Sequence, residues 1–285
     1  MKGIIIKGIG GFYYVLSDGK TYECKARGKF RLDKLTPMVG DEVLFNFQER
    51  CGQIVDICPR KNYLIRPPVA NVTKAFIIMC FKNPNLNLHL LNTYILMCNH
   101  NDIEPIVCFN KIDLIESLDE YEWVIDMLKK SDIKYLLVEG KNDKGLDEMR
   151  NTLSGNLSIL CGVSGVGKST IFNKITGEDF MDIGELSEKV SIGKNTTRHC
   201  QLAVSYGGYI TDTPGFSSFA TDFSKEEIKD AFLEFNQYEN DCKFRGCYHH
   251  REPGCAVKKA VDEGKLSKER YDFYIMMIEN SRKGK

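Results

Sequence analysis

The chain has 285 residues, more than one ordinary single-core domain, and at roughly 150 residues per domain this length predicts two or three domains. Its 42% hydrophobic and 27% charged residues are typical of a folded globular protein and exclude general disorder. The longest apolar runs, such as 75–81, are far shorter than the ~20 residues needed to cross a bilayer, so we expect no membrane span and no membrane partner. Most of the 11 cysteines stand singly inside apolar segments, which favours reduced thiols and a cytoplasmic protein.

The balanced total charge conceals a basic N-terminal segment. Residues 1–66 contain 12 Lys or Arg against 7 Asp or Glu, whereas residues 67–220 contain 14 against 19. Stretches rich in Ile, Tyr, Phe and Val, separated by turn residues, predict short strands within 3–17, 20–28 and 40–48 and hence a small OB-type barrel. Barrels of this type bind nucleic acid through an exposed basic and aromatic face, and the alternative is a solvated charged surface on a structural barrel. The candidate residues for such a face are Tyr13, Tyr22, Lys25, Arg27, Lys29 and Arg31.

Pro67-Pro68 marks the end of this segment, because the dipeptide prevents a continued helix and favours an extended linker. Beyond it, apolar runs alternate with amphipathic stretches, which predicts an α/β domain with a parallel sheet over residues 67–220. The expected strands are 74–81, 105–110, 134–139, 157–162 and 209–211. The expected helices are 88–100, 120–131 and 168–177.

A phosphate-binding loop follows the strand expected at 157–162. The pattern GxxxxGK[ST] stands here between a strand and a helix, as nucleotide binding requires. Its glycines let backbone N–H groups wrap a phosphate chain, Lys168 meets the β- and γ-phosphates, and Ser169 ligates Mg²⁺. The residues expected to contact the nucleotide are Gly162, Val163, Ser164, Gly165, Val166, Gly167, Lys168, Ser169 and Thr170.

A second motif indicates which base is bound. Asn110, Lys111, Ile112 and Asp113 form an NKxD sequence at the end of an expected strand, the guanine-recognition motif of GTPases. The Asp113 carboxylate can accept two hydrogen bonds from guanine, whereas adenine would leave it poorly satisfied at a cost of about 1–3 kcal/mol. By itself NKID could be a polar strand-to-helix turn with Asp as a cap, but beside a phosphate loop it favours GTP and disfavours an ATP-dependent kinase.

Two further segments fit the switches of a GTPase. Asp212 begins the sequence DTPG after the expected strand 209–211, so its carboxylate can hold Mg²⁺ through water while the Gly215 N–H senses the γ-phosphate. The polar stretch 193–199 is interpreted as the first switch, with Thr197 closing on Mg²⁺. Thr196 is the rival for that role, and an ordinary surface loop is the alternative for the whole stretch.

The order of these motifs is circularly permuted, because NKxD precedes the phosphate loop. The site can still assemble, since chemistry depends on spatial position and a sheet can be re-threaded. The chain continues directly from DTPG into the C-terminal segment, which can therefore receive a switch movement without an adaptor.

The C-terminal segment, 221–285, contains a pattern typical of a structural zinc site. Cys242, Cys247, His249 and Cys255 match the Cys₃His class in a reducing compartment, with His250 as the alternative to His249 and incidental thiols as the alternative to a metal. Four protein ligands close the coordination, which predicts one structural zinc per chain. The flanks 225–235 and 257–280 predict amphipathic helices, and hence a small helical domain fastened by metal.

Together, the basic barrel, the permuted motifs and the CX₄CXHX₅C pattern resemble the ribosome small-subunit-dependent GTPases of the RsgA (YjeQ/YloQ) family over nearly the whole chain. The resemblance implies a cytoplasmic bacterial GTPase that binds the small (30S) ribosomal subunit and its rRNA late in assembly, with hydrolysis stimulated by the subunit. It also implies an OB barrel in residues 1–66 and zinc ligands at Cys242, Cys247, His249 and Cys255. The resemblance further implies contact from the Gly140 backbone to the guanine carbonyl, although this chain departs from the family here, with Glu139-Gly140-Lys141 where relatives commonly have a Ser-Ala-like pair.

Catalysis is expected to be slow without a partner. Many GTPases place a water-orienting glutamine directly after DxxG, but Gly215 is followed here by Phe216, which can neither position nor polarise water. His199 is a candidate water-positioning group, and a solvated histidine is its alternative. Stimulation of about 10³–10⁵ is available when a partner completes such a site. The second hypothesis is a monomeric, nucleotide-gated RNA-binding assembly factor with little turnover, and we expect a monomer in either case.

Overall fold

The computed structural model describes residues 1–28, 30, 35–48, 51–65, 67–177, 200–212 and 223–281. The chain forms two compact units, each built from segments that are distant in sequence. The first unit comprises Met1–Lys74, Gly140–Cys161 and Gly167–Ser218, and the second comprises Ala75–Glu139, Gly162–Val166 and Phe219–Lys285. No helix in the described part of the chain is long and apolar enough to cross a membrane.

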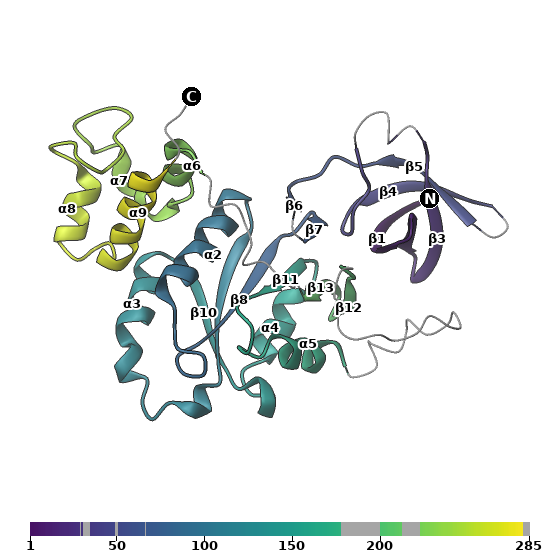
Figure 1. The fold of residues 1–285 in the computed structure, drawn as a ribbon, viewed down its shortest axis with the longest axis horizontal. Coiled ribbons are helices and arrows are strands. Elements are labelled where there is room, and N and C mark those ends of the chain that lie inside the picture. The colour runs from purple at the N-terminus through teal and green to yellow at the C-terminus, as the bar shows by residue number, and fades with distance from the viewer. Residues whose placement is uncertain are drawn as a thin grey trace. The chain divides into compact units, whose positions relative to one another are not determined.

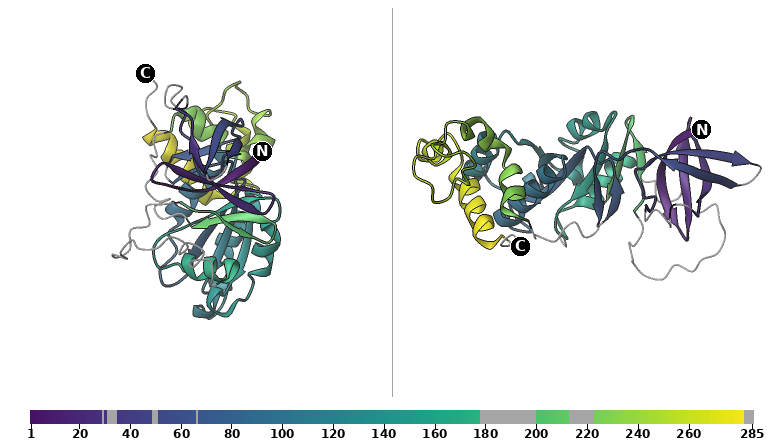
Figure 2. Two further views of the ribbon diagram at one scale, coloured as in Figure 1. Left: turned by 90° about the vertical axis from the view of Figure 1, so that its right-hand side faces the viewer. Right: turned by 90° about the horizontal axis from the view of Figure 1, so that it is seen from above.

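The N-terminal part of the first unit is a closed barrel with the strand order β1-β2-β3-β5-β4 (Figures 1 and 2). Its strands are β1 (Lys2–Ile9), β2 (Phe12–Ser17), β3 (Lys20–Ala26), β4 (Glu42–Gln48) and β5 (Cys51–Ile57). All neighbours are antiparallel except β3 and β5, which run parallel. Alternate residues point inward, and Ile5, Val15 and Phe45 are completely buried there. The predicted OB-type barrel is confirmed.

The stretch 3–17 is a hairpin of two strands. Gly10 and Gly11 connect β1 to β2 with φ values of +60° and +85°. Two successive positive φ values suit a tight turn between twisted strands, and glycine adopts them without steric cost. Because apolar residues flank the two glycines, the sequence pattern does not indicate where the first strand ends and the second begins.

The α/β part of the first unit contains the neighbouring strands β11 (Leu157–Cys161), β13 (Gly208–Asp212) and β12 (Ala203–Ser205). The pairing of β11 with β13 is parallel, as the sequence predicts for the strands before the phosphate loop and before DTPG, whereas β12 is antiparallel to β13. Helices α4 (Asp147–Leu153) and α5 (Lys168–Thr176) contact these strands, and a short 3₁₀ turn, η3 (Gly140–Asn142), contacts α5. A small hairpin of β6 (Tyr63–Ile65) and β7 (Pro68–Ala70) follows the barrel in the chain.

The second unit contains the neighbouring strands β10 (Lys134–Val138), β9 (Glu104–Asn110) and β8 (Lys74–Cys80). Residues 106–110 and 75–80 are buried throughout, as expected of strands covered on both faces. Helix α2 (Leu88–His100) packs on β9, and α3 (Glu122–Lys130) packs on β10. The short turns η1 (Ile112–Leu114) and η2 (Asp119–Tyr121) connect β9 to α3.

The C-terminal segment of the second unit is helical, and in Figure 1 its helices gather beside α2. It contains α6 (Lys225–Asp230), η6 (Leu233–Phe235), α7 (Asn236–Glu239), α8 (Ala256–Asp262) and α9 (Lys268–Asn280). The stretch 257–280 is therefore two helices: Gly264, with φ of +68°, lies between them, and the Ser267 side chain caps α9 by accepting from the Arg270 N–H. Similarly, α6 ends at Asp230, so the helix expected over 225–235 is shorter than predicted.

Candidate nucleotide site and metal cluster

The phosphate loop leaves β11 at a position that only glycine fits. Gly162 has a φ of +141°, and a Cβ added there would lie 2.3 Å from the Ile78 carbonyl oxygen. Gly165 and Gly167 also have positive φ values, of +83° and +95°, so the chain curls back on itself before entering α5. Gly167 is the N-cap of α5, and the unsatisfied N–H groups of its first turn give this end of the helix a positive potential that favours phosphate.

The NKxD motif directly supports this loop within the second unit. The Asn110 side chain is 3% exposed, and its amide Nδ2 donates to the Val166 carbonyl at 2.8 Å. Lys111 adopts a left-handed conformation with φ of +61°, and its Nζ donates to the Gly165 carbonyl at 2.7 Å. The base-recognition motif and the phosphate loop thus meet, although 56 residues of sequence separate Asn110 from Val166.

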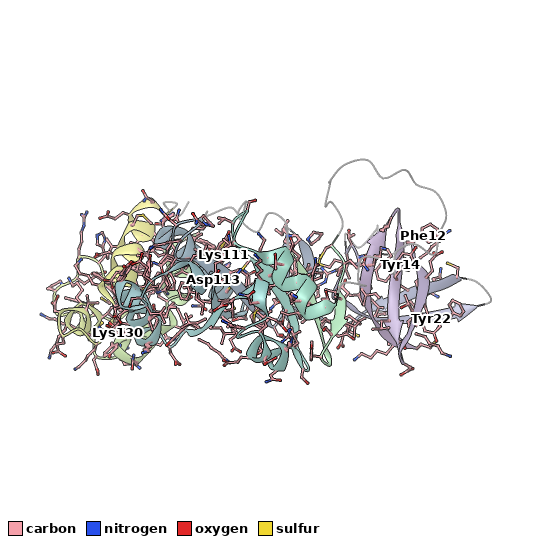
Figure 3. All side chains as sticks on the ribbon, turned by 90° about the horizontal axis from the view of Figure 1, so that it is seen from below. Phe12, Tyr14, Tyr22, Lys111, Asp113 and Lys130 are labelled. Carbon is pink, nitrogen blue, oxygen red and sulfur yellow. The ribbon has the colours of Figure 1, made fainter. Side chains whose placement is uncertain are left out.

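Asp113, the residue expected to recognise guanine, makes no hydrogen bond to the phosphate loop within the described residues. It lies in η1, is solvent-exposed, and stands close to Lys111 in Figure 3. Ile112, which starts η1, is half-buried. An exposed carboxylate, held by a short turn whose preceding residues are anchored on the phosphate loop, can accept hydrogen bonds from a guanine edge.

Sequence reasoning missed the second support of the Lys111 ammonium, the Asn83 carbonyl, which accepts from Nζ at 2.6 Å. It also missed a stack of three aromatic rings: Phe81 lies 4.3 Å from Phe109 and 4.2 Å from Tyr121 between ring centroids. These rings pack the end of β9 against η2 and so hold the motif that follows. The sequence signal was present only as an Asn-Pro turn after the buried strand β8.

A candidate magnesium position lies at the start of α5 in the first unit. The parallel register of β11 and β13 places Asp212 opposite Leu160, near the start of the loop. The Ser169 hydroxyl donates to Asp212 Oδ2 at 3.4 Å. A hydroxyl and a carboxylate are hard oxygen donors of the kind that Mg²⁺ takes together with nucleotide phosphates. The remaining loop positions, Ser164 and Thr170, are exposed, and Val163 is half-exposed.

The other switch predictions lie outside the described residues. These are Thr196, Thr197, His199, Gly215 and Phe216.

Gly140 begins η3 and is buried in the first unit. The loop that follows it is held by Arg150 of α4, whose guanidinium pairs with Asp143 and with Asp147. The same guanidinium reaches the Lys174 carbonyl of α5 at 3.4 Å. Arg150 therefore connects the loop after Gly140 to α5, the helix that begins at the phosphate loop.

The four predicted metal ligands converge in the second unit. Their ligand atoms, from Cys242, Cys247, His249 and Cys255, all lie within 4.8 Å of one another. The Sγ atoms of Cys242 and Cys255 are 3.9 Å apart, and His249 Nδ1 lies 3.6 Å and 3.3 Å from them. Tetrahedral zinc with bonds of about 2.3 Å to sulfur and 2.0–2.1 Å to nitrogen sets separations of roughly 3.5–3.8 Å, so the residues present fit this ion.

The cluster also distinguishes the two histidines. His249 is completely buried with a φ of +54°, a strained conformation for this residue type that aims its ring at the sulfurs. His250 points elsewhere, and its Nε2 lies 3.1 Å from a Glu279 carboxylate oxygen. Burial among the other ligands raises the pKa of the Cys247 thiol, and a bound metal would take it as the thiolate.

The barrel places aromatic and basic side chains in pairs. Lys25 stands over the Phe12 ring at 4.7 Å and Lys7 over the Tyr14 ring at 5.8 Å. Phe12 and Tyr14 alternate with the buried Val15 and hence face outward, whereas Tyr13 shares the inward side of Val15. Figure 3 labels Phe12, Tyr14 and Tyr22 on the barrel strands.

Two of the predicted face residues are therefore placed differently. Tyr22 alternates with Glu23 and shares the side of the buried Cys24, and its ring lies 5.3 Å from Phe45 and 5.0 Å from Phe47. Tyr13 and Tyr22 contribute to the inner side of the barrel, and the outward aromatic residues are Phe12 and Tyr14. Lys25 and Arg27 are exposed as expected, whereas Lys29 and Arg31 lie outside the described residues.

Comparisons with known proteins agree with a barrel followed by a GTPase domain. The model of the family described as RsgA GTPase matches residues 57–222, and that of the RsgA N-terminal domain matches residues 2–54. The chain is 49% identical over 286 residues to the small ribosomal subunit biogenesis GTPase RsgA of Clostridium novyi (strain NT), covering 100% of this chain and 98% of that protein. It is 47% identical over 292 residues to the protein of the same name from Clostridium botulinum (strain Kyoto / Type A2), covering both completely, 100% of each.

Two solved structures are similar over nearly the whole chain. The crystal structure of YloQ, a circularly permuted GTPase, has a TM-score of 0.84 and 34% identity, covering 98% of this chain and 93% of that one. The structure of YjeQ from Thermotoga maritima has a TM-score of 0.84 and 31% identity, covering 99% of both chains. With a family model matching more than half of its length and full-length relatives at this identity, the chain belongs to the RsgA GTPase family.

Proposed function

We propose that this GTPase acts in biogenesis of the small ribosomal subunit, binding the subunit and its rRNA late in assembly and hydrolysing GTP faster when bound. Two full-length relatives are named small ribosomal subunit biogenesis GTPases, which supports the biogenesis part of this proposal. The observation that carries the nucleotide half of the proposal is the contact of Asn110 and Lys111 with Val166 and Gly165, which joins base recognition to the phosphate loop.

The nucleotide is proposed to be held from its two ends. Asp113 accepts from the guanine N1–H and exocyclic amine, the N–H groups of the loop surround the phosphates, and Lys168 neutralises the β- and γ-phosphates. Ser169, Thr197 and Asp212 would hold magnesium, which would supply positive charge to the phosphates. The Gly140 backbone is proposed for the guanine carbonyl, and Gly215 for the γ-phosphate.

Hydrolysis is proposed to depend on the partner. Phe216 occupies the position after Gly215 where other GTPases carry a water-orienting glutamine, so the free protein has no such group there. We propose that the bound subunit completes the site, with His199 as the candidate water-positioning group of this chain. Stimulation of about 10³–10⁵ is what completion of such a site supplies.

The proposed partners follow from the remaining parts. Residues 1–66 form the RNA-binding barrel, 67–220 the permuted GTPase domain, and 221–285 a helical domain with one structural zinc on Cys242, Cys247, His249 and Cys255. The cation–aromatic pairs Lys25–Phe12 and Lys7–Tyr14 suit RNA, because bases stack on rings while ammonium groups attract phosphates. We propose a cytoplasmic monomer that exchanges GTP and GDP.

The deciding experiment is GTP turnover by the full chain with and without purified small subunits, repeated over a range of salt concentrations. We expect strong stimulation that weakens with salt, since RNA phosphate contacts release counterions. Lys168→Ala should abolish turnover and subunit maturation together. Unstimulated turnover of many per second would contradict the proposal. Maturation that survives Lys168→Ala would support the assembly factor with little turnover instead.

A further inference from the structure

Strand β1 carries an extra residue at the centre of its pairing with β2. Ile5 pairs with Val15 and Lys7 with Tyr14, so that Ile6 has no opposite residue and forms a β-bulge. A bulged residue is left out of the ladder, and its backbone groups are re-aimed. The Ile6 carbonyl accepts from the Leu202 N–H at 2.8 Å, and the neighbouring Lys7 forms an isolated antiparallel bridge with Gln201.

The 200–202 segment is held on its other side by β13. The Cys200 thiol lies 3.4 Å from the Thr211 hydroxyl, and Thr211 directly precedes Asp212. Leu202 is 1% exposed and leads into β12, which pairs with β13 from Ala203 opposite Ile210 onward. This segment thus lies between the barrel and the strand that carries the proposed magnesium-side carboxylate, all within the first unit.

The 200–202 segment is also connected to the proposed magnesium position. Cys200 contacts Thr211, the residue before Asp212, and β12 pairs with β13, so a movement of β13 at Asp212 would also shift the 200–202 segment. On the barrel side, Lys7 is both the bridge partner of Gln201 and the cation over Tyr14.

We infer that the bulge at Ile6 anchors the 200–202 segment and makes the barrel part of the nucleotide-responsive element of this GTPase. The state of the nucleotide then alters β1 and the outward pair Lys7–Tyr14, and RNA bound to the barrel alters nucleotide affinity by the same factor, as linkage requires. The nucleotide half of this inference rests on the proposed position of magnesium beside Asp212, and the RNA half rests on the proposed binding of the small subunit.

The test is hydrogen exchange on the full chain, bound either to GDP or to a non-hydrolysable GTP analogue and free of ribosomes. In the unmodified chain, exchange over residues 4–9 should differ between the two nucleotides by at least about fivefold, the lower end of typical coupling. Replacing Leu202 by its α-hydroxy acid removes the donating N–H and keeps the side chain, and it should reduce the difference to less than about twofold. The matched control is the same replacement at Ile133, whose N–H donates to Leu128 at 2.9 Å in the second unit, and it should leave the difference intact.

Deletion of Ile6 provides an independent variant, because it restores one-to-one pairing of β1 with β2 and removes the accepting carbonyl. It should abolish the difference as well. Identical exchange in both nucleotide states of the unmodified chain, or a full difference in both variants, would overturn the inference.

Binding to purified small subunits in the two nucleotide states separates this inference from the proposed function. Nucleotide-dependent exchange in β1 that the two variants abolish supports the anchor even if the chain binds no subunit, and that second result would refute the proposed function alone. If subunits are bound, their preference between GTP-analogue and GDP forms should fall in the Leu202 variant and persist in the Ile133 control. A preference unchanged in the Leu202 variant would count against the anchor.

Discussion

The ammonium group of Lys111 lies between two backbone carbonyls, those of Asn83 and Gly165. These two hydrogen bonds fix the shape of the loop at Gly165. The neutral side chain of Asn110 also fixes the loop, because its amide donates to the Val166 carbonyl. Two of the four residues of the guanine motif therefore act on the phosphate loop itself.

Lys111→Ala should weaken GDP binding by roughly 10- to 150-fold, because hydrogen bonds to a charged group contribute about 1.5–3 kcal/mol. The measurement is the Kd of fluorescent GDP by titration. Lys130→Ala is the control, since Lys130 makes only a surface pair with Asp126 four residues earlier in α3. An equal loss of GDP affinity in the two variants would show that the effect comes from removing any positive charge and not from the hydrogen bonds of Lys111.

Gly162 and Gly165 provide a second matched pair at this scale. Both have positive φ, but a Cβ at Gly162 would lie 2.3 Å from the Ile78 carbonyl, whereas one at Gly165 meets nothing within 4 Å. Gly165→Ala should cost only the backbone strain of about 1–2 kcal/mol, and Gly162→Ala should cost more because the backbone has to move as well. Thermal unfolding without nucleotide checks this, and an equal decrease in Tm would contradict it.

At the scale of elements, the C-terminal helices are joined to α2 by a buried ion pair. Arg270 of α9 pairs with Glu234 at 2.8 Å, and the two side chains are 1% and 3% exposed. The guanidinium also donates to Asn92 of α2 at 3.2 Å and lies 4.5 Å above the Phe232 ring. A pair this well buried fixes how α9, η6 and α2 pack together.

Arg270→Ala should lower the free energy of unfolding by about 3–5 kcal/mol, because it leaves the Glu234 carboxylate buried without a partner. The double variant with Glu234→Gln should recover part of this loss by removing the orphaned charge. Lys268→Ala breaks an exposed pair with Asp272 in the same helix and should cost far less than Arg270→Ala, because water screens this pair. Denaturant titration measures all three, and a neutral Arg270→Ala would contradict the argument.

The metal cluster makes a separate prediction. His249→Ala should lose the bound zinc and lower Tm, whereas His250→Ala, which removes only the contact with Glu279, should retain about one zinc per chain. Metal analysis of the purified variants gives the stoichiometry, and a strong chelator should lower Tm in the His250 variant but have little further effect in the His249 variant. Zinc retained by His249→Ala would refute this ligand set.

At the scale of the whole molecule, the two compact units are interleaved in sequence, and the C-terminal segment belongs to the same unit as β8, β9 and β10. Asn99 of α2 donates to the Ala231 carbonyl at 2.8 Å, and the His89 ring lies 5.3 Å from Phe273. Such contacts bind the segment to the unit that carries the guanine motif. The boundary near residue 220 remains a prediction.

Deleting residues 223–285 should therefore destabilise what remains, because it exposes the face of α2 that α6 and α9 cover. We expect a lower Tm and weaker GDP binding than in the full chain, measured on the same preparation. A truncated chain that unfolds at the full-length temperature would show that the C-terminal segment folds and acts independently.

The sequence by itself determined the motifs, the barrel, the order of strands and helices, and the metal-ligand spacing. Each of these features is predicted by a pattern of neighbouring residues. Glycines stand where the backbone turns sharply, apolar runs stand where strands are buried, and cysteines recur at short intervals. Only the tertiary structure decided that His249 and not His250 faces the sulfurs, that Phe12 and Tyr14 are the outward aromatic residues, and that Ile6 is a bulge whose carbonyl meets Leu202. These outcomes depend on the direction of a side chain or carbonyl relative to segments distant in sequence, and such directions are set by packing and strand register, which no local pattern encodes.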